Sequence, residues 1–150
     1  MCVNRATGKR KRSWRAIGQY VPGPVVVGAD GSIGSQAALR FAIEEAALRA
    51  APLMVVCALA DCPARLGGEQ QLQDNVERLL DQLEKEHPEV TVLRQITAGG
   101  PLSALLAAAH EAQMVVVGAR GLGGVRGMRL GSVARGVLHH APCPVGIIHP

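Results

Sequence analysis

The sequence predicts an α/β fold in which one doubly wound, mainly parallel sheet of five strands carries helices on both faces. Two observations lead to this fold class. Five short runs of β-branched or aliphatic residues alternate with longer segments of helical pattern, which is typical of parallel sheets. The first run, residues 24–29, is apolar without interruption, as expected of a strand that is covered on both faces.

The first half of the chain supplies three further elements. They are a helix over residues 33–50, a strand over 53–58 and a helix over 70–86. Ser32 is placed to cap the first helix, and Pro52 prevents that helix from continuing. The second helix is indicated by Leu and Val side chains that recur at helical spacing. Residues 59–69 contain Pro and Gly and therefore form a loop.

The second half repeats the alternation. Its elements are a strand over 90–96, a helix over 101–112, a strand over 114–118, a helix over 132–140 and a strand over 145–149. Pro101 suits the first position of a helix, where a missing N–H costs nothing. A long loop rich in Gly and Arg separates the last two strands from each other, ahead of the final helix.

The charge of the chain is concentrated at its start. Of the 150 residues, 48% are hydrophobic, and the formal net charge is +4. Residues 1–15 hold six basic and no acidic side chains; without these six, ten basic residues face twelve acidic ones, a charge of −2. We divide the chain into a basic tail, residues 1–22, predicted to be disordered, and one domain, residues 23–150. The alternative role for the tail is a weak contact with nucleic acid or an anionic surface.

Several function classes are disfavoured. Only Trp14, Tyr20 and Phe41 are aromatic, which argues against a protein that stacks bases on aromatic rings. No run approaches the roughly 18 apolar residues of a membrane helix, and residues 13–23 are too mixed for a signal peptide. We therefore expect a cytoplasmic protein without membrane contact. The spacing of its Cys and His residues matches no zinc pattern, so no metal site is predicted.

The loop after the fourth strand carries the chemistry. Gly118 and Gly121 are separated by two residues, and nine more lead to Gly131 and Ser132, which open a helix. Glycines let the backbone approach an anion closely. Free N–H groups at the start of the last helix, around Ser132 and Val133, point outward with the positive end of the helix dipole. The loop is therefore predicted to bind phosphate.

Other nucleotide motifs are absent. The sequence has no GxxxxGK[ST], and neither Gly28 nor Gly121 begins a GxGxxG. The loop does carry positive charge, on Arg120, Arg126 and Arg129. We leave open whether Arg126 and Arg129 strengthen triphosphate binding or are simply solvated.

The spacing Gly-x2-Gly-x9-Gly-Ser resembles the ATP-binding signature of the universal stress protein family. The segment 25–32 is similar to the family's opening, and 131–145 to its ending. The resemblance covers roughly residues 24–149 and implies the strand order 3-2-1-4-5. It implies a regulatory, stress-type protein that binds ATP, here expected with Mg²⁺, hydrolyses it little or not at all, and pairs as a homodimer through its last strand.

The resemblance also assigns positions around the nucleotide. Asp30 corresponds to the aspartate facing adenosine, Ala58 borders adenine, and Gly121 lies with the phosphates. The full set of implied binding residues is Gly28, Ala29, Asp30, Ala58, Val117, Gly118, Arg120, Gly121, Gly131, Ser132 and Val133.

Two departures and two alternatives remain. Gln113 stands where the family usually has an acidic residue, and Gly100 where it often has aspartate. No catalytic residue is predicted, because no Lys falls in the loop and only Asp30 and Asp61 are expected near strand carboxyl ends. The alternatives are a slow ATPase or phosphotransfer enzyme, and a protein-interaction module that binds no nucleotide. A regulatory protein partner is also expected.

Overall fold

A computed structural model of the chain describes residues 15–16, 19–20, 23–58, 68–122 and 129–150. Five parallel strands form one sheet in the order β5-β4-β3-β6-β7. The strands are β3 (Val25–Gly28), β4 (Leu53–Ala58), β5 (Val92–Thr97), β6 (Met114–Gly118) and β7 (Val145–Ile148). Numbered along the domain, this is the order 3-2-1-4-5. The predicted fold class and strand order are confirmed.

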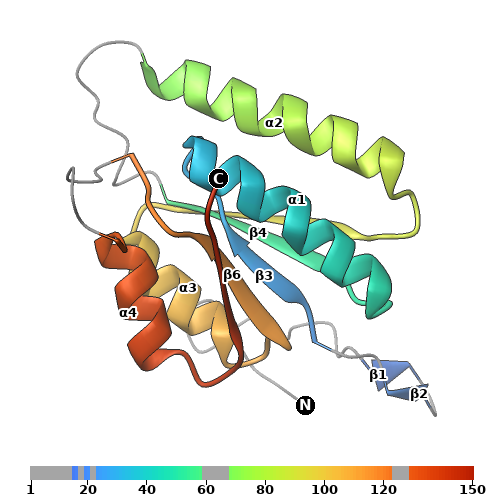
Figure 1. Ribbon diagram of the computed structural model, residues 1–150. Helices are drawn as coiled ribbons and strands as arrows, with labels where there is room; N and C mark the ends of the chain where they lie inside the picture. The colour runs from blue at the N-terminus through green and yellow to red at the C-terminus, as the bar shows by residue number, and fades with distance from the viewer. Residues whose placement is uncertain (1–14, 17–18, 21–22, 59–67, 123–128) are drawn as a thin grey trace.

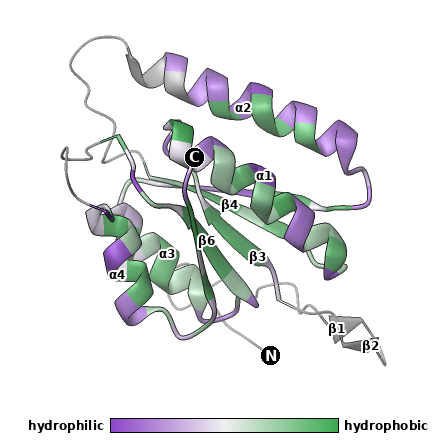
Figure 2. Cartoon of the chain, viewed as in Figure 1, coloured by the Kyte–Doolittle hydropathy of each residue, from purple (hydrophilic) through white to green (hydrophobic). Residues whose placement is uncertain are grey.

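Four helices cover the two faces of the sheet (Figure 1). They are α1 (Ile33–Leu48), α2 (Gly68–Glu86), α3 (Pro101–Ala109) and α4 (Ser132–His140). One apolar cluster joins α1 and α2 to the sheet, and a second joins α3 and α4 to its other face. Strands β3 and β6 are uniformly hydrophobic, whereas α2 alternates between hydrophobic and hydrophilic positions (Figure 2). The centre of the sheet is therefore buried on both sides, as the continuous apolar runs predict.

The element boundaries agree with the predicted ones to within three residues, and the differences have local causes. Helix α1 ends at Leu48 because Ala50 adopts the left-handed conformation, with φ of 49°. Strand β5 begins two residues late, since the N–H of Val90 donates to the carbonyl of His87 in the turn after α2. Helix α3 ends at Ala109.

Within the predicted tail, two short strands pair antiparallel, β1 (Arg15–Ala16) with β2 (Gln19–Tyr20). Residues 1–14, which include Trp14 and most of the basic side chains, lie outside the described residues. The predicted disorder of the tail stays a prediction. No helix in the described part of the chain is long and apolar enough to cross a membrane.

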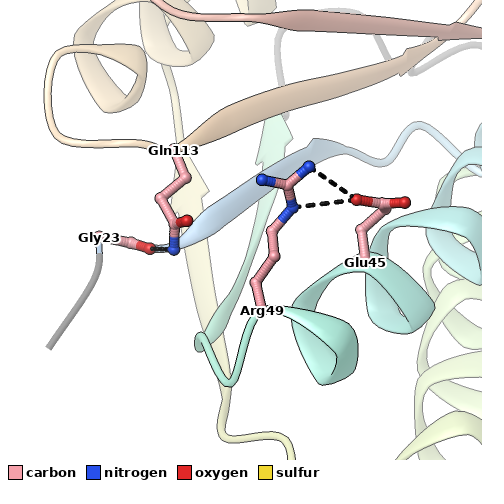
Figure 3. Close-up of polar contacts among 4 residues, drawn as sticks. All are labelled: Gly23, Glu45, Arg49 and Gln113. Carbon is pink, nitrogen blue, oxygen red and sulfur yellow. Dashed lines mark hydrogen bonds and ion pairs between the residues drawn. The ribbon is translucent and has the colours of Figure 1, made fainter.

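The amino ends of β3 and β6 are fastened to each other (Figure 3). The side-chain amide of Gln113 donates to the carbonyl of Gly23 over 2.7 Å, and its backbone N–H donates to the carbonyl of Pro24 over 3.0 Å. An acidic residue at position 113, as the resemblance expects, has no N–H for the first bond. The departure at Gln113 therefore has a structural use away from the strand carboxyl ends. Figure 3 also shows Arg49 bonded to Glu45 one turn earlier in α1, over 2.9 Å.

Candidate functional site

A cavity of about 450 Å³ opens at the carboxyl ends of β3, β4 and β6, the edge at which open α/β sheets bind ligands. All eleven residues that the resemblance assigns to the nucleotide line this cavity. They are Gly28, Ala29, Asp30, Ala58, Val117, Gly118, Arg120, Gly121, Gly131, Ser132 and Val133. The structure thus brings the predicted set together, while their binding roles stay predictions.

The turn from β3 into α1 satisfies its own polar groups. Asp30 accepts the N–H of Ser32 over 2.9 Å, and the Ser32 hydroxyl in turn accepts the N–H of Ser35 over 3.1 Å. Gly31 between them has φ of 81°, in the left-handed region that favours glycine. The Ser35 hydroxyl, buried at 3% exposure, donates to the carbonyl of Ser32. The predicted cap at Ser32 is confirmed, and the N–H of Ser35 at this helix end is used by the protein itself.

Helix α1 and the glycine-rich loop meet backbone to backbone. A Cβ on Gly118 would lie 2.6 Å from the carbonyl carbon of Gly34, and a Cβ on Gly34 would lie 2.7 Å from the carbonyl oxygen of Arg120. Neither position tolerates a side chain, because the atoms met are main-chain atoms that cannot swing aside. The two glycines therefore fix how closely the loop approaches the start of α1.

A second contact joins the same two segments through a side chain. The Oδ2 atom of Asp30 accepts the backbone N–H of Leu122 over 3.1 Å. Gly121 lies so close to this oxygen that a Cβ there would collide with it. Asp30 therefore uses one oxygen within its own turn and the other across the cavity rim.

The start of α4 differs, since no side chain caps it. The N–H of Gly131 donates to the carbonyl of Ala119 over 2.8 Å, and the first helical bond runs from the N–H of Arg135 to the carbonyl of Gly131 over 3.0 Å. Gly131 provides no side-chain cap. The N–H groups of residues 132–134 meet no acceptor in the described part of the chain. These donors, at the positive end of the helix, suit an anion.

The charges at the cavity are predominantly positive. Arg120 and Arg135 line it and are exposed, while Asp30 is the acidic residue of the lining. Arg129 is exposed and does not line the cavity, and Arg126 lies outside the described residues. Beside the site, burial raises the pKa of the Cys57 thiol, with smaller contributions from the charges of Glu77 and Asp30. That thiol is therefore neutral at pH 7.

Ten further residues line the cavity without having been predicted. They are Ser32, Ser35, Val56, Pro101, Leu105, Ala119, Leu122, Leu130, Ala134 and Arg135. Leu105 reaches the site from α3 and would lie 3.3 Å from a Cβ on Gly28. Arg135 could have been predicted from the sequence, because a cation in the first turn of a helix is unfavourable next to the positive end of the dipole and therefore suggests another use. Leu105 could not, since only the packing of α3 brings it to the cavity.

The residues that the structure describes offer little to a catalytic mechanism. No Lys lines the cavity among them, and they contain no group of three His, Cys, Asp or Glu side chains that could hold a metal ion. Asp61, the second carboxylate expected near a strand end, lies outside the described residues.

The fold and the cavity define a doubly wound α/β domain with an uncapped helix start at its strand carboxyl edge. The chain belongs to the universal stress protein family, whose model matches residues 23–149. A universal stress protein of Mycobacterium tuberculosis is 37% identical over 129 residues, which cover 81% of this chain and 44% of the relative. One from Mycolicibacterium smegmatis is 35% identical over 134 residues, covering 85% of this chain and 46% of the relative. The chain thus spans less than half the length of these relatives.

Solved structures of the family share the fold. A universal stress protein in complex with cAMP superimposes with a TM-score of 0.64 at 29% identity, covering 85% of this chain and 98% of that one. A universal stress protein from Archaeoglobus fulgidus in complex with dAMP gives a TM-score of 0.63 at 27% identity, covering 84% and 97%. These two relatives bind adenine nucleotides.

Proposed function

We propose that this domain is a regulatory module that binds ATP, together with Mg²⁺, in the cavity at the carboxyl ends of β3, β4 and β6. The observation that carries the proposal is the meeting of all eleven expected residues around one cavity whose rim holds three open N–H donors. A cavity of about 450 Å³ lies within the usual range for small-molecule sites, roughly 300–1,000 Å³. The two nucleotide-bound relatives support an adenine nucleotide as ligand.

The lining divides into an apolar and a polar part, which suits the two ends of a nucleotide. Val56, Ala58, Leu105 and Val117 provide an apolar wall for the base. The start of α4, with Arg135 beside it, provides donors and charge for phosphates. Because a triphosphate carries more charge than cAMP or dAMP, this positive end favours ATP among adenine nucleotides. The Mg²⁺ would be held by the phosphate oxygens, as is usual for this ion.

Co-purifying nucleotide provides the first test. Mass spectrometry of the native protein is expected to identify ATP. Calorimetry then locates the site: Gly131→Val directs its methyl groups at the loop, since a Cβ on Gly131 already lies 3.6 Å from the Ala119 carbonyl oxygen and 3.7 Å from the Gly121 nitrogen. Gly131→Ala is the matched control, because these are ordinary contact distances. Equal ATP affinity in Gly131→Val and wild type would contradict the site.

Hydrolysis is expected to be absent or far below the median enzyme rate of about 10 s⁻¹. Both oxygens of Asp30 accept backbone N–H groups, so this carboxylate is poorly placed to activate water. A phosphate-release assay on the pure protein measures the rate. Turnover at or above the median rate, abolished by Asp30→Ala, would favour the alternative of an ATP-hydrolysing enzyme.

We also propose a homodimer through β7, at the edge of the sheet. Its partner strand in the described part of the chain is β6 alone, and no charged side chain lies within Val145–Ile148. An unguarded apolar edge is a liability unless it is paired. The other edge strand differs, because Arg94 of β5 forms ion pairs with Glu77 and Glu84 of α2, over 3.2 and 2.8 Å.

The test of the dimer has to avoid the core. Ile147 and Ile148 pack against the two apolar clusters, so charged substitutions there would damage the fold itself. The carbonyls of Pro144 and Ile148 accept N–H groups at the β6 side, and peptide directions alternate along a strand, so the N–H of Ile147 points to the open edge. Ile147→Pro blocks that donor, and Ile147→Ala loses similar packing without blocking it. Sedimentation should show a dimeric Ile147→Ala and a monomeric Ile147→Pro; a wild type that is monomeric at micromolar concentration would contradict the dimer.

A further inference from the structure

We propose that Asp30 is a positioning residue whose carboxylate fastens the glycine-rich loop, so that it controls binding of the phosphates through the loop. The inference rests on the proposed function, because it concerns the same nucleotide site. It differs from what the family resemblance implies for Asp30, which is a direct contact with adenosine.

Each oxygen of the Asp30 carboxylate accepts one backbone N–H. Its Oδ1 accepts the N–H of Ser32 over 2.9 Å, and its Oδ2 accepts the N–H of Leu122, 92 positions further along the chain, over 3.1 Å. The side chain therefore bridges the turn after β3 and the loop after β6. The N–H of Leu122 is thereby directed at Asp30 and is unavailable to a phosphate.

Gly121 fits this bridge. A Cβ at position 121 would collide with the Oδ2 atom of Asp30 where that oxygen lies, so any other residue there would force the carboxylate to shift. Glycine at this position therefore favours the bridge. The two glycines of this spacing thus each make a close packing contact: Gly118 packs against Gly34, and Gly121 packs against Asp30.

The fastened segment, residues 118–122, is hydrogen-bonded to the residue that opens α4. Its near end is fixed where Gly118 packs on Gly34, and its far end where Leu122 donates to Asp30. Between them, the carbonyl of Ala119 accepts the N–H of Gly131 over 2.8 Å. Loss of the bond at Asp30 would free one end of the segment that holds Gly131, and with it the open donors at the start of α4.

The two roles of Asp30 make different predictions for ligands with and without phosphates. A direct contact with adenosine would serve ATP and adenosine equally. A fastened loop serves the phosphates alone, because Arg120 and the start of α4 lie on the loop side of the cavity. The ratio of the two affinities therefore separates the roles.

The experiment is calorimetry of Asp30→Asn with ATP and with adenosine. Asparagine keeps an oxygen for the N–H of Ser32 but turns an NH₂ group toward the N–H of Leu122, so the variant removes the bridge alone. We expect ATP affinity to fall about tenfold or more and adenosine affinity to change by less than about twofold. An equal fall for both ligands would overturn the proposal. Asp81→Asn, on the exposed surface of α2, is the control for the loss of one negative charge.

A second measurement needs no ligand and keeps the proposal separate from the proposed function. Amide exchange followed by NMR should show Leu122 protected in wild type and in Asp81→Asn, and exposed in Asp30→Asn. If wild type binds neither ligand while Leu122 follows this pattern, the proposed function fails and the bridge stands. Equal protection of Leu122 in wild type and Asp30→Asn overturns the bridge.

Gly121→Ala approaches the same contact from the loop and covers the case in which Asp30→Asn fails to fold. Its added methyl group displaces Oδ2, so ATP binding should weaken while adenosine binding stays within about twofold. The Asp30→Gly background removes the colliding oxygen, and there the same alanine should have little further effect on ATP affinity. Additive losses in this double-mutant cycle would overturn the inference.

Discussion

Two helices begin at the same edge of the sheet, α1 after β3 and α4 after the glycine-rich loop, and only α1 has a side-chain cap. At α1 the Ser32 hydroxyl accepts the N–H of Ser35, and Asp30 accepts the N–H of Ser32. At α4 the capping position is Gly131, which has no side chain to offer. Both helix ends line one cavity.

The difference supports α4, and not α1, as the helix end that meets the proposed ligand. A helix leaves its first N–H groups without helical partners, and a side-chain cap normally satisfies one of them. Helix α1 follows this rule and gains stability from it. Helix α4 forgoes the cap and also carries Arg135 in its first turn, where the dipole disfavours a cation. Both features of α4 support the proposal that an anion supplies the missing partner at this cavity.

The largest expected effect comes from making α4 resemble α1. Gly131→Asp supplies a carboxylate that can cap the helix, so the free energy of unfolding should rise by a few tenths of a kcal/mol. The same carboxylate occupies the phosphate donors and repels the phosphates, so ATP affinity should fall about hundredfold. Calorimetry and urea unfolding measure the two changes.

Gly131→Asn is the control, because its side chain can cap the helix without adding a charge. It separates the effect of occupying the N–H donors from the effect of repelling the phosphates. Undiminished ATP affinity in Gly131→Asp would mean that the start of α4 does not bind the phosphates.

A smaller effect is expected at Arg135, the cation in the first turn of α4. Arg135→Glu should raise the free energy of unfolding by several tenths of a kcal/mol, because an acidic residue suits the helix dipole. ATP affinity should fall about tenfold as a charge-assisted contact is lost. Calorimetry with ATP and with adenosine measures the two losses, and the loss of adenosine affinity should be small. Arg78→Glu on the exposed face of α2 reverses the same charge away from the cavity. A similar loss of ATP affinity in this control would mean that the net charge of the protein, and not a contact at Arg135, causes the effect.

The contrast also shows what could be predicted from the sequence. Three elements, β4, β6 and α4, have the boundaries that the sequence predicts. Pro52 precedes β4, Gly118 ends β6, and Gly131 and Pro142 stand on either side of α4. The cap at Ser32 was also predictable, because it is a local contact with a residue only three positions away. Six of the eleven site residues, all in the loop or at the start of α4, were indicated by the glycine spacing, the helix start and the charge of Arg120. The other five, Gly28, Ala29, Asp30, Ala58 and Val117, came only from the family resemblance.

The remaining features depend on packing between distant segments. The bond from Leu122 to Asp30 joins residues 92 positions apart, and nothing local to either residue indicates it. Gly34 lies inside a helical pattern, where glycine is unfavourable, and its use is visible only once the carbonyl oxygen of Arg120 is found where its Cβ would be. Leu105 likewise reaches the cavity because α3 packs beneath β3.

The smallest effect on the ligand is expected at Ser32, although it too lines the cavity. Ser32→Ala removes the acceptor for the N–H of Ser35, a residue only 3% exposed, so the free energy of unfolding should fall by about 1 kcal/mol. ATP affinity should stay within about twofold of wild type, because this hydroxyl is engaged within its own turn. Urea unfolding beside calorimetry tests both halves of the prediction. Ser103→Ala makes the same chemical change at an exposed position of α3 and should cost less, while Ser32→Asp should restore stability. A variant Ser32→Ala that keeps its stability and loses ATP would mean that α1, and not α4 alone, presents its end to the ligand.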